Sequence, residues 1–306
     1  MARGGRALRH ARGVLALPSR CTGQGLLGHE SSWVGADAPS FQGSDVSGGL
    51  RPLIAAARVA RSTPPRAALQ HATPVEYRSA MTRTLNGRRV LVTQAGEFMG
   101  PVLCEVLAEH GAEVIRSTAS LLESDAAFNV VQSAGAIDIL VANLAYAAPT
   151  TLAAESTDIE WTQTFAALVD PLPRLFRAVL PKMIERRCGK ILVIGSASAL
   201  RGMKRASTYS AARGAQLAYV QSVGVEVAVH NVQVNAIAQN FVENSTYFPP
   251  EVQANPRFQE RLKREVPLGR LVAAREDAEF AAYLCSEAAN CFVGQVFPVY
   301  GGWAAR

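Results

Sequence analysis

The feature that most constrains the fold of this chain is a regular alternation of short apolar runs with helical stretches from residue 86 onward. The apolar runs, which we expect to form strands, lie at 88–93, 113–116, 138–142, 190–195, 232–238 and 294–299. Helical stretches fill the intervals at 101–110, 121–133, 157–187, 208–230 and 275–286. The strand runs are continuously apolar, which is typical of strands that are buried on both faces of a parallel sheet. The sequence therefore predicts an α/β fold, a Rossmann-like doubly wound parallel sheet in a single domain.

This fold class also predicts where a ligand would bind. In open α/β sheets the ligand lies beyond the carboxyl ends of the strands. The loops that leave those ends span 94–100, 143–150, 196–207 and 239–250. We therefore expect these four loops to line the functional site.

Residues 1–80 differ in composition from the rest of the chain. They are rich in Arg, Gly, Ser, Ala and Pro and show no sustained helical or strand period, so we predict a disordered segment. The Arg-rich, acid-poor start is typical of a targeting segment, but we favour a start placed too far upstream, with Met81 opening the domain at 81–306. Ten arginines, no lysine and four acidic residues in 1–80 account for the whole net charge of +6. The remainder has no basic field suited to nucleic acid.

Membrane and metal binding find no support in the sequence. No apolar run approaches the roughly 18–20 residues that span a bilayer. The five cysteines form no Cys-x-x-Cys pair and no spacing typical of a metal site. We interpret them as free thiols of a reducing compartment and expect a cytoplasmic protein without a bound metal.

The loop TQAGEFMG, at 93–100, follows the first expected strand, where a dinucleotide-binding unit has its glycine-rich turn. Gly96 and Gly100 are present. Gln94 and Phe98 stand where two further glycines would let a pyrophosphate approach the backbone. The loop is therefore poorly suited to a nucleotide, and we expect no cofactor.

Three polar residues in the segment 195–216 form the candidate catalytic group. Ser196 lies at the end of an expected buried strand. Tyr209 and Arg213 are four residues apart near the start of a helix and therefore share one face. A nearby positive charge favours the ionised form of tyrosine, and arginine does not readily release a proton itself. The pair is suited to make Tyr209 a general base, while Ser196 positions a substrate oxygen.

The Ser-x12-Tyr-x3-basic spacing resembles the short-chain dehydrogenase/reductase superfamily, in which the basic residue is usually Lys. With Arg213 at that position and an aromatic residue in the first loop, residues 86–304 resemble the halohydrin (haloalcohol) dehalogenases, cofactor-free relatives of those reductases. Other departures from the reductase pattern agree with this resemblance. Gln94 and Phe98 replace loop glycines, and Thr118 lies where an NAD enzyme has a ribose-binding Asp. The segment ANLA at 142–145 replaces the usual Asn-Ala-Gly, and the segment AQNF at 238–241 replaces the usual Pro-Gly. Leu168 is the nearest match to the Asn of the longer reductase tetrad.

The resemblance implies a reaction and a set of site residues. The reaction is the cofactor-independent conversion of vicinal halohydrins to epoxides with release of halide, and the reverse opening of epoxides by small anions such as azide, cyanide or nitrite. The halide would be walled by Phe98, Gln239, Asn240, Phe241 and Val242. The substrate pocket would be shaped by Tyr146, Pro149, Ser198, Leu200, Met203, Tyr247 and Phe248. The family further implies a homotetramer that pairs through the helices at about 157–187 and 208–230.

Two other functions remain open at this stage. The chain could be an atypical NADP-dependent reductase in which Arg213 does the work of Lys, or a non-catalytic binding protein of the superfamily. The first requires a phosphate cradle that Gln94 and Phe98 disfavour. The second leaves the joint presence of Ser196, Tyr209 and Arg213 without an explanation.

Overall fold

The computed structural model describes residues 84–304, and the six strands in this range run parallel in one sheet. The order across the sheet is β2-β1-β3-β4-β5-β6. The strands are β1 (Arg89–Val92), β2 (Glu113–Arg116), β3 (Ile139–Asn143), β4 (Gly189–Ser196), β5 (Val232–Gln239) and β6 (Val296–Val299). Every residue of β3, β4 and β5 is buried, as the continuous apolar runs predicted.

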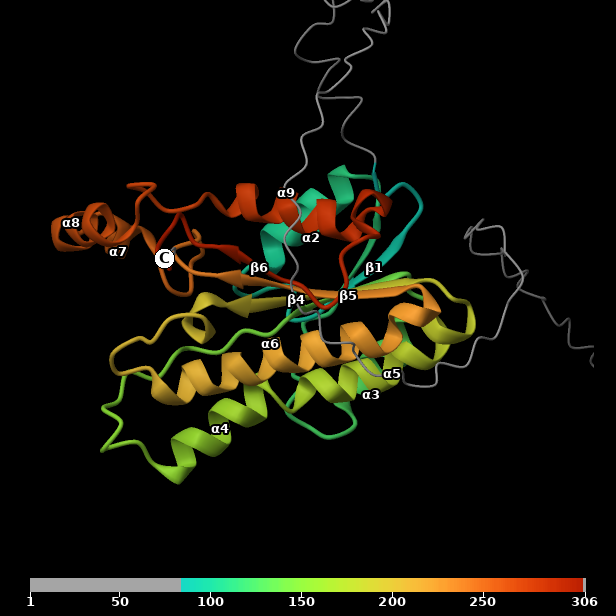
Figure 1. Cartoon of the computed structure of the whole chain (residues 1–306), viewed down its shortest axis with the longest axis horizontal. Coiled ribbons are helices and arrows are strands. Elements are labelled where there is room, and N and C mark those ends of the chain that lie inside the picture. The colour runs from blue at the N-terminus through green and yellow to red at the C-terminus, as the bar shows by residue number, and fades with distance from the viewer. Residues whose placement is uncertain (1–83, 305–306) are drawn as a thin grey trace, which may run out of the picture. The chain divides into compact units, whose positions relative to one another are not determined.

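Helices cover both faces of the sheet, so the predicted doubly wound fold is confirmed. Figure 1 shows α2 (Gly100–Glu109) and α9 (Ala274–Cys285) on one face, and α3 (Ala126–Ala134), α5 (Pro171–Glu185) and α6 (Ser207–Val227) on the other. Each face has its own apolar cluster, one joining α2 and α9 to the sheet and the other joining α3, α5 and α6 to it. Helix α4 (Asp158–Leu168) packs against α6.

The order of the strands locates the expected binding crevice. The chain moves from β1 to β2 on one side and then crosses to β3 on the other, so the sheet changes winding direction between β1 and β3. Ligands of such sheets bind beyond the strand ends at this switch point. Further along the edge, Ser196 at the end of β4 pairs with Gln239 at the end of β5. The candidate serine and the predicted halide turn are therefore neighbours.

Two helical predictions were wrong in detail. The single helix expected over 157–187 is broken between α4 and α5, because Pro171 has no N–H to continue the hydrogen-bond ladder. The helix expected from 121 begins only at Ala126, after Asp125. Helix α6 ends at Val227, three residues before the predicted bound of 230, and a short 3₁₀ helix, Ala228–His230, follows it. The other helices and the strands begin and end within two residues of the predicted bounds.

The structure also contains elements that the sequence pattern did not predict. Helices α7 (Pro250–Gln253) and α8 (Pro256–Glu265) follow the loop after β5. The sequence does mark the start of α8, with an asparagine followed by a proline. The Asn255 side chain accepts a hydrogen bond from the backbone N–H of Arg257, and Pro256 is the first residue of the helix. Short 3₁₀ helices η2 (Ala197–Ala199), η3 (Ala228–His230) and η4 (Glu287–Ala289) complete the described part.

The predictions about residues 1–80 fall outside the described residues. Within residues 84–304, no helix is long and apolar enough to cross a membrane. Cys104, Cys285 and Cys291 are free thiols, as expected. The expectation is wrong for Cys188, which is disulfide-bonded.

Candidate active site

Helix α6 presents Tyr209 and Arg213 on its buried face. The buried positions of this helix recur at helical spacing, at Tyr209, Ala212, Arg213, Gln216, Leu217, Val220, Val223, Gly224 and Val227. The guanidinium carbon of Arg213 lies 5.1 Å from the centroid of the Tyr209 ring. The predicted pairing of the two side chains is thus present, in a geometry that places a positive charge against the phenol ring.

Arg213 is fully buried, with 0% of its surface exposed. Its Nη1 donates to the Ile194 carbonyl at 3.2 Å and to Gln216 Oε1 at 3.0 Å, and its Nη2 donates to the Leu144 carbonyl at 3.1 Å. All three acceptors are neutral, and among the ion pairs of the described residues none includes Arg213. A buried cation without a carboxylate partner stabilises a negative charge that forms beside it.

Ser196 is held in place by its neighbour Ser198. The Ser196 hydroxyl donates to Ser198 Oγ at 3.0 Å, and the Ser198 backbone N–H donates back to Ser196 Oγ at 3.2 Å. This reciprocal pair arises because Ser196 ends β4 and caps the short helix η2. Ser198, predicted to contact substrate, orients the Ser196 hydroxyl through these two hydrogen bonds.

Tyr247 reaches the same centre from the segment after β5. Its Oη lies 2.6 Å from the Tyr146 carbonyl oxygen and 3.3 Å from Tyr209 Oη. Burial raises the pKa of Tyr247 well above its usual range. Tyr247 therefore keeps its proton, which can be donated to the Tyr146 carbonyl or to Tyr209 Oη, but to only one of them at a time. Sequence reasoning placed this residue in the pocket but missed its contact with the candidate base.

The first loop has the backbone shape of a glycine-rich turn. Gln94 and Phe98 have φ angles of +43° and +51°, in the left-handed region that favours glycine. The Gln94 side chain accepts a hydrogen bond from the Ala145 N–H at 2.7 Å, and Asn143 Nδ2 donates to the carbonyls of Gln94 and Glu97, each at 3.0 Å. Side chains thus bridge the two loops at the switch point, where a pyrophosphate would need open backbone.

Phe98 lies beside the candidate catalytic group. Its ring meets the Tyr247 ring edge to face, with centroids 5.8 Å apart. Tyr247 in turn reaches Tyr209 Oη. The aromatic residue that replaces a loop glycine is therefore one contact away from the candidate base.

The turn that follows β5 contains one donor suited to an anion. Asn240 Nδ2 is buried and has no hydrogen-bond partner within the described residues. Its Oδ1 accepts from the Phe241 N–H at 2.9 Å, and Phe241 has a φ of +51°. Val242 forms a parallel bridge with Val272, which ties the turn to the segment before α9.

The side chains of two predicted halide residues make contacts within the protein. Gln239 Nε2 donates to Asp277 Oδ2 on α9, so this side chain is already engaged. The Phe241 ring packs on Phe248 and Trp303, with centroids 5.9 and 6.0 Å away, because the turn directs it into the apolar cluster. Gln239 and Phe241 shape the turn through their backbone and packing.

Asp277 is a buried carboxyl that the sequence did not single out. Its residue surface is 0% exposed, and the hydrogen bond from Gln239 engages only Oδ2, leaving Oδ1 without a partner in the described part of the chain. Burial raises the pKa of Asp277 to about 7, although the Gln239 hydrogen bond acts in the opposite direction. Its position in the first turn of α9, where an apolar residue would be expected to pack, was the available signal.

This carboxyl predicts a stability that falls with rising pH. A folded-state pKa of about 7 against an ordinary 3.8 means that the folded protein holds a proton that the unfolded chain loses between about pH 4 and 7. Ionisation of the buried Asp277 carboxyl lowers the free energy of unfolding. This loss is absent below that pH window and complete above it, with an upper bound of about 4 kcal/mol. We expect Asp277→Asn to raise the unfolding temperature at pH 8 and to change it little at pH 4.5. Glu251→Gln, at an exposed carboxylate, is the control, and an equal effect of Asp277→Asn at both pH values would contradict the prediction.

The remaining predicted substrate residues divide into two groups. Tyr146, Met203 and Phe248 are partly buried and pack on the apolar cluster that contains Tyr209. Pro149 is partly buried in the loop after β3, and Leu200 is 46% exposed. The Phe248 ring stacks on Phe241 and packs at a tilt against Phe258, so it joins α8 to the turn after β5.

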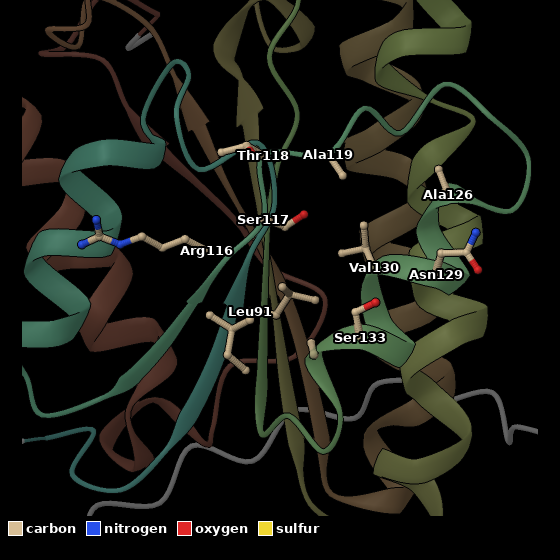
Figure 2. A pocket seen from close by; sticks show the side chains of 11 residues that line it. Leu91, Arg116, Ser117, Thr118, Ala119, Ala126, Asn129, Val130 and Ser133 are labelled. Atoms are coloured by element: carbon tan, nitrogen blue, oxygen red, sulfur yellow. The ribbon is translucent and has the colours of Figure 1, made fainter.

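A cavity of about 450 Å³ lies elsewhere, between the ends of β1 and β2 and helix α3. Figure 2 shows Ser117, Val130 and Ser133 around it, while the Arg116 side chain extends away from them. Ser196, Tyr209 and Arg213 do not line it. Thr118 does, at the place where an NAD enzyme would bind ribose. Across residues 84–304 no cluster of His, Cys, Asp and Glu could hold a metal ion.

Comparison with known proteins places these features in a family. Residues 77–304 match a family model described as enoyl-(acyl carrier protein) reductase. The 3-oxoacyl-[acyl-carrier-protein] reductase FabG of Escherichia coli (strain K12) is 30% identical over 241 residues, which are 71% of this chain and 97% of that protein. The corresponding FabG of Salmonella typhimurium is 29% identical over 244 residues, 72% of this chain and 98% of that protein.

Solved structures extend the comparison. A structure titled "Dehalogenation enzyme" is 30% identical, with a TM-score of 0.68, over 72% of this chain and 99% of its own. L-sorbose reductase of Gluconobacter frateurii has the same fold at 22% identity, with a TM-score of 0.68, over 74% of this chain and 100% of its own. The parallel sheet, the Ser-Tyr-basic spacing and these matches agree, and the chain belongs to the short-chain dehydrogenase/reductase family.

Proposed function

We propose that the protein is a halohydrin dehalogenase that converts vicinal halohydrins to epoxides without a cofactor. The observation that carries this proposal is the fully buried Arg213, 5.1 Å from the Tyr209 ring and without a carboxylate partner in the described residues. Such a charge favours a phenolate, which is the form that a general base requires. The dehalogenation enzyme at 30% identity supports the same activity.

The reaction asks little of the protein beyond proton removal and stabilisation of the leaving group. The Ser196 hydroxyl and the Tyr209 oxygen bind the substrate hydroxyl, and Tyr209 takes its proton. The resulting alkoxide attacks the neighbouring carbon, so that a C–O bond forms as the carbon–halogen bond breaks and halide leaves. Because the nucleophile is tethered to its target, ring closure is effectively unimolecular. Opening of epoxides by small anions is the reverse of this step.

The leaving halide would meet Phe98 and the turn after β5. Asn240 Nδ2 is a buried donor without a partner within residues 84–304. The positive edge of an aromatic ring, as Phe98 offers, also favours an anion. Together they provide anion binding without a formal charge.

The decisive test is chloride release from 1,3-dichloro-2-propanol by the purified protein without added nucleotide. We expect stoichiometric formation of epoxide and chloride. No release of chloride, together with turnover of a ketone in the presence of NADPH, would overturn the proposal.

A reductase is the second candidate, favoured by the FabG relatives at 29–30% identity and by the cavity beside Thr118. The residues of the first loop do not fit a dinucleotide pyrophosphate, since the Gln94 side chain bridges to Ala145 across the switch point. Calorimetric titration with NADPH distinguishes the two candidates, and the dehalogenase predicts no binding.

Phe98→Ala tests the anion site. Alanine also carries a Cβ, so the substitution leaves the strain of the left-handed backbone in place and removes only the ring. We expect inhibition by bromide to weaken by about 10-fold, which corresponds to about 1.4 kcal/mol. Phe128→Ala, at a 55% exposed ring on α3, is the matched control. Unchanged inhibition by bromide would remove Phe98 from the site.

The proposed assembly is a homotetramer paired through α4, α5 and α6. Large apolar side chains are exposed on α4, on α6 and on η3, which follows α6. They are Ile159, Trp161, Val225 and Val229. Light scattering of the purified protein measures the mass of the assembly.

A further inference from the structure

The buried face of α6 carries two long polar side chains, fully buried, where the helical pattern calls for apolar ones. Arg213 and Gln216 are both 0% exposed. A polar group buried without a partner destabilises the fold, so each requires one in the interior. Arg213 has a role in the proposed reaction, whereas Gln216 has none assigned.

Gln216 links Arg213 to the broken end of α4. Its Oε1 accepts a hydrogen bond from Arg213 Nη1 at 3.0 Å, and its Nε2 donates to the Leu168 carbonyl. Leu168 is the last residue of α4, and its carbonyl is available because the N–H four residues on, that of Leu172, donates to the Val169 carbonyl instead. The orientation of the amide follows from chemistry, because a guanidinium can only donate and a carbonyl can only accept.

The neutrality of this link is its important property. The other acceptors of Arg213 are the carbonyls of Ile194 and Leu144, and the ionisable groups that face it are the phenols of Tyr209 and Tyr247. A carboxylate at position 216 would also accept from the guanidinium, but it could not donate to the Leu168 carbonyl and would cancel much of the positive potential of Arg213 at the phenol.

We propose that Gln216 is a positioning residue, which holds the Arg213 guanidinium against the Tyr209 ring while leaving its charge uncompensated. This inference rests on the proposed role of Tyr209 as the base. It assigns to Gln216 an effect on the ionisation of Tyr209 that a residue of purely structural importance would not have.

The test compares Gln216→Glu and Gln216→Met with the wild-type protein. Ultraviolet absorbance of tyrosinate is followed against pH, and the signal of Tyr209 is isolated by subtracting the same titration of each protein with Tyr209→Phe added. Gln221→Glu, the same change at an exposed position of α6, is the matched control.

We expect the midpoint of the Tyr209 signal in Gln216→Glu to move upward by at least about one pH unit, since an introduced carboxylate offsets the guanidinium. Gln216→Met should move it in the same direction by less, because the guanidinium loses its anchor to α4 but keeps its charge. Gln221→Glu should not move it. For an active wild-type enzyme, the acidic limb of the pH–rate profile should shift with the midpoint.

A midpoint that does not move in the folded variants, or that moves to lower pH in either, overturns the proposal. If Gln216→Glu does not fold, Gln216→Met decides alone by the same criterion. The titration needs no substrate and no turnover. A wild-type protein that releases no chloride would therefore refute the dehalogenase proposal while the role of Gln216 is still decided by the titration.

Discussion

Tyr209→Phe is expected to lower the rate of chloride release from a vicinal chlorohydrin by at least about 10³-fold, near the upper end of what a general base contributes. The substitution removes the atom that takes the proton and leaves the ring, and therefore the packing on Arg213, in place. Tyr247 cannot substitute as the base, because burial raises its pKa well above its usual range. Initial rates of chloride release at saturating substrate measure the effect.

The controls for this variant lie on the same helix and in the same site. Tyr219→Phe makes the identical change on α6, where the ring packs on Phe176 with centroids 5.3 Å apart, and should leave the rate unchanged. Tyr247→Phe removes the hydroxyl that contacts Tyr209 Oη and should lower the rate of chloride release by about 10-fold. A Tyr209→Phe enzyme that keeps more than about a tenth of the wild-type rate would place the base elsewhere.

Arg213→Met is expected to have the second largest effect, a loss of about 10²–10³-fold in kcat, since electrostatic stabilisation by one group is commonly of this size. The substitution removes the only cation that faces Tyr209 among the described contacts, and the acidic limb of the pH–rate profile should move to higher pH. It also leaves the Ile194 and Leu144 carbonyls and Gln216 Oε1 without their donor. The unfolding temperature must therefore be measured alongside the rate.

Arg213→Lys separates charge from geometry. Lysine restores a cation, but its single nitrogen cannot reproduce the fork that spans three acceptors on β4, on α6 and after β3. We expect it to recover part of the rate and to return the acidic limb toward its wild-type position. If Arg213→Met and Arg213→Lys show the same profile, the charge of Arg213 is not what activates Tyr209.

The positions and the parallel type of the strands were predictable from their apolar runs, and burial on both faces is confirmed for β3, β4 and β5. This expectation of burial is wrong for β2 and β6, which lie at the two edges of the sheet and are only partly buried or exposed. The stretch 157–187 was predicted as one helix, whereas α4 ends at Leu168 and α5 begins at Pro171. The proline that cannot continue the helical hydrogen-bond ladder, Pro171, was visible in the sequence. Helix α8 was missed although Asn255 and Pro256 mark its start.

By itself, the sequence determined the parallel sheet, the end of β4 at Ser196 and the shared helix face of Tyr209 and Arg213, because these depend on local periodicity. The tertiary structure decided what surrounds them. It brings Tyr247 to Tyr209, Asp277 to Gln239, and neutral acceptors from β4, α6 and the loop after β3 to Arg213. These contacts join segments far apart along the chain, and the charge left uncompensated in the site depends on which groups packing places there. No local spacing specifies that.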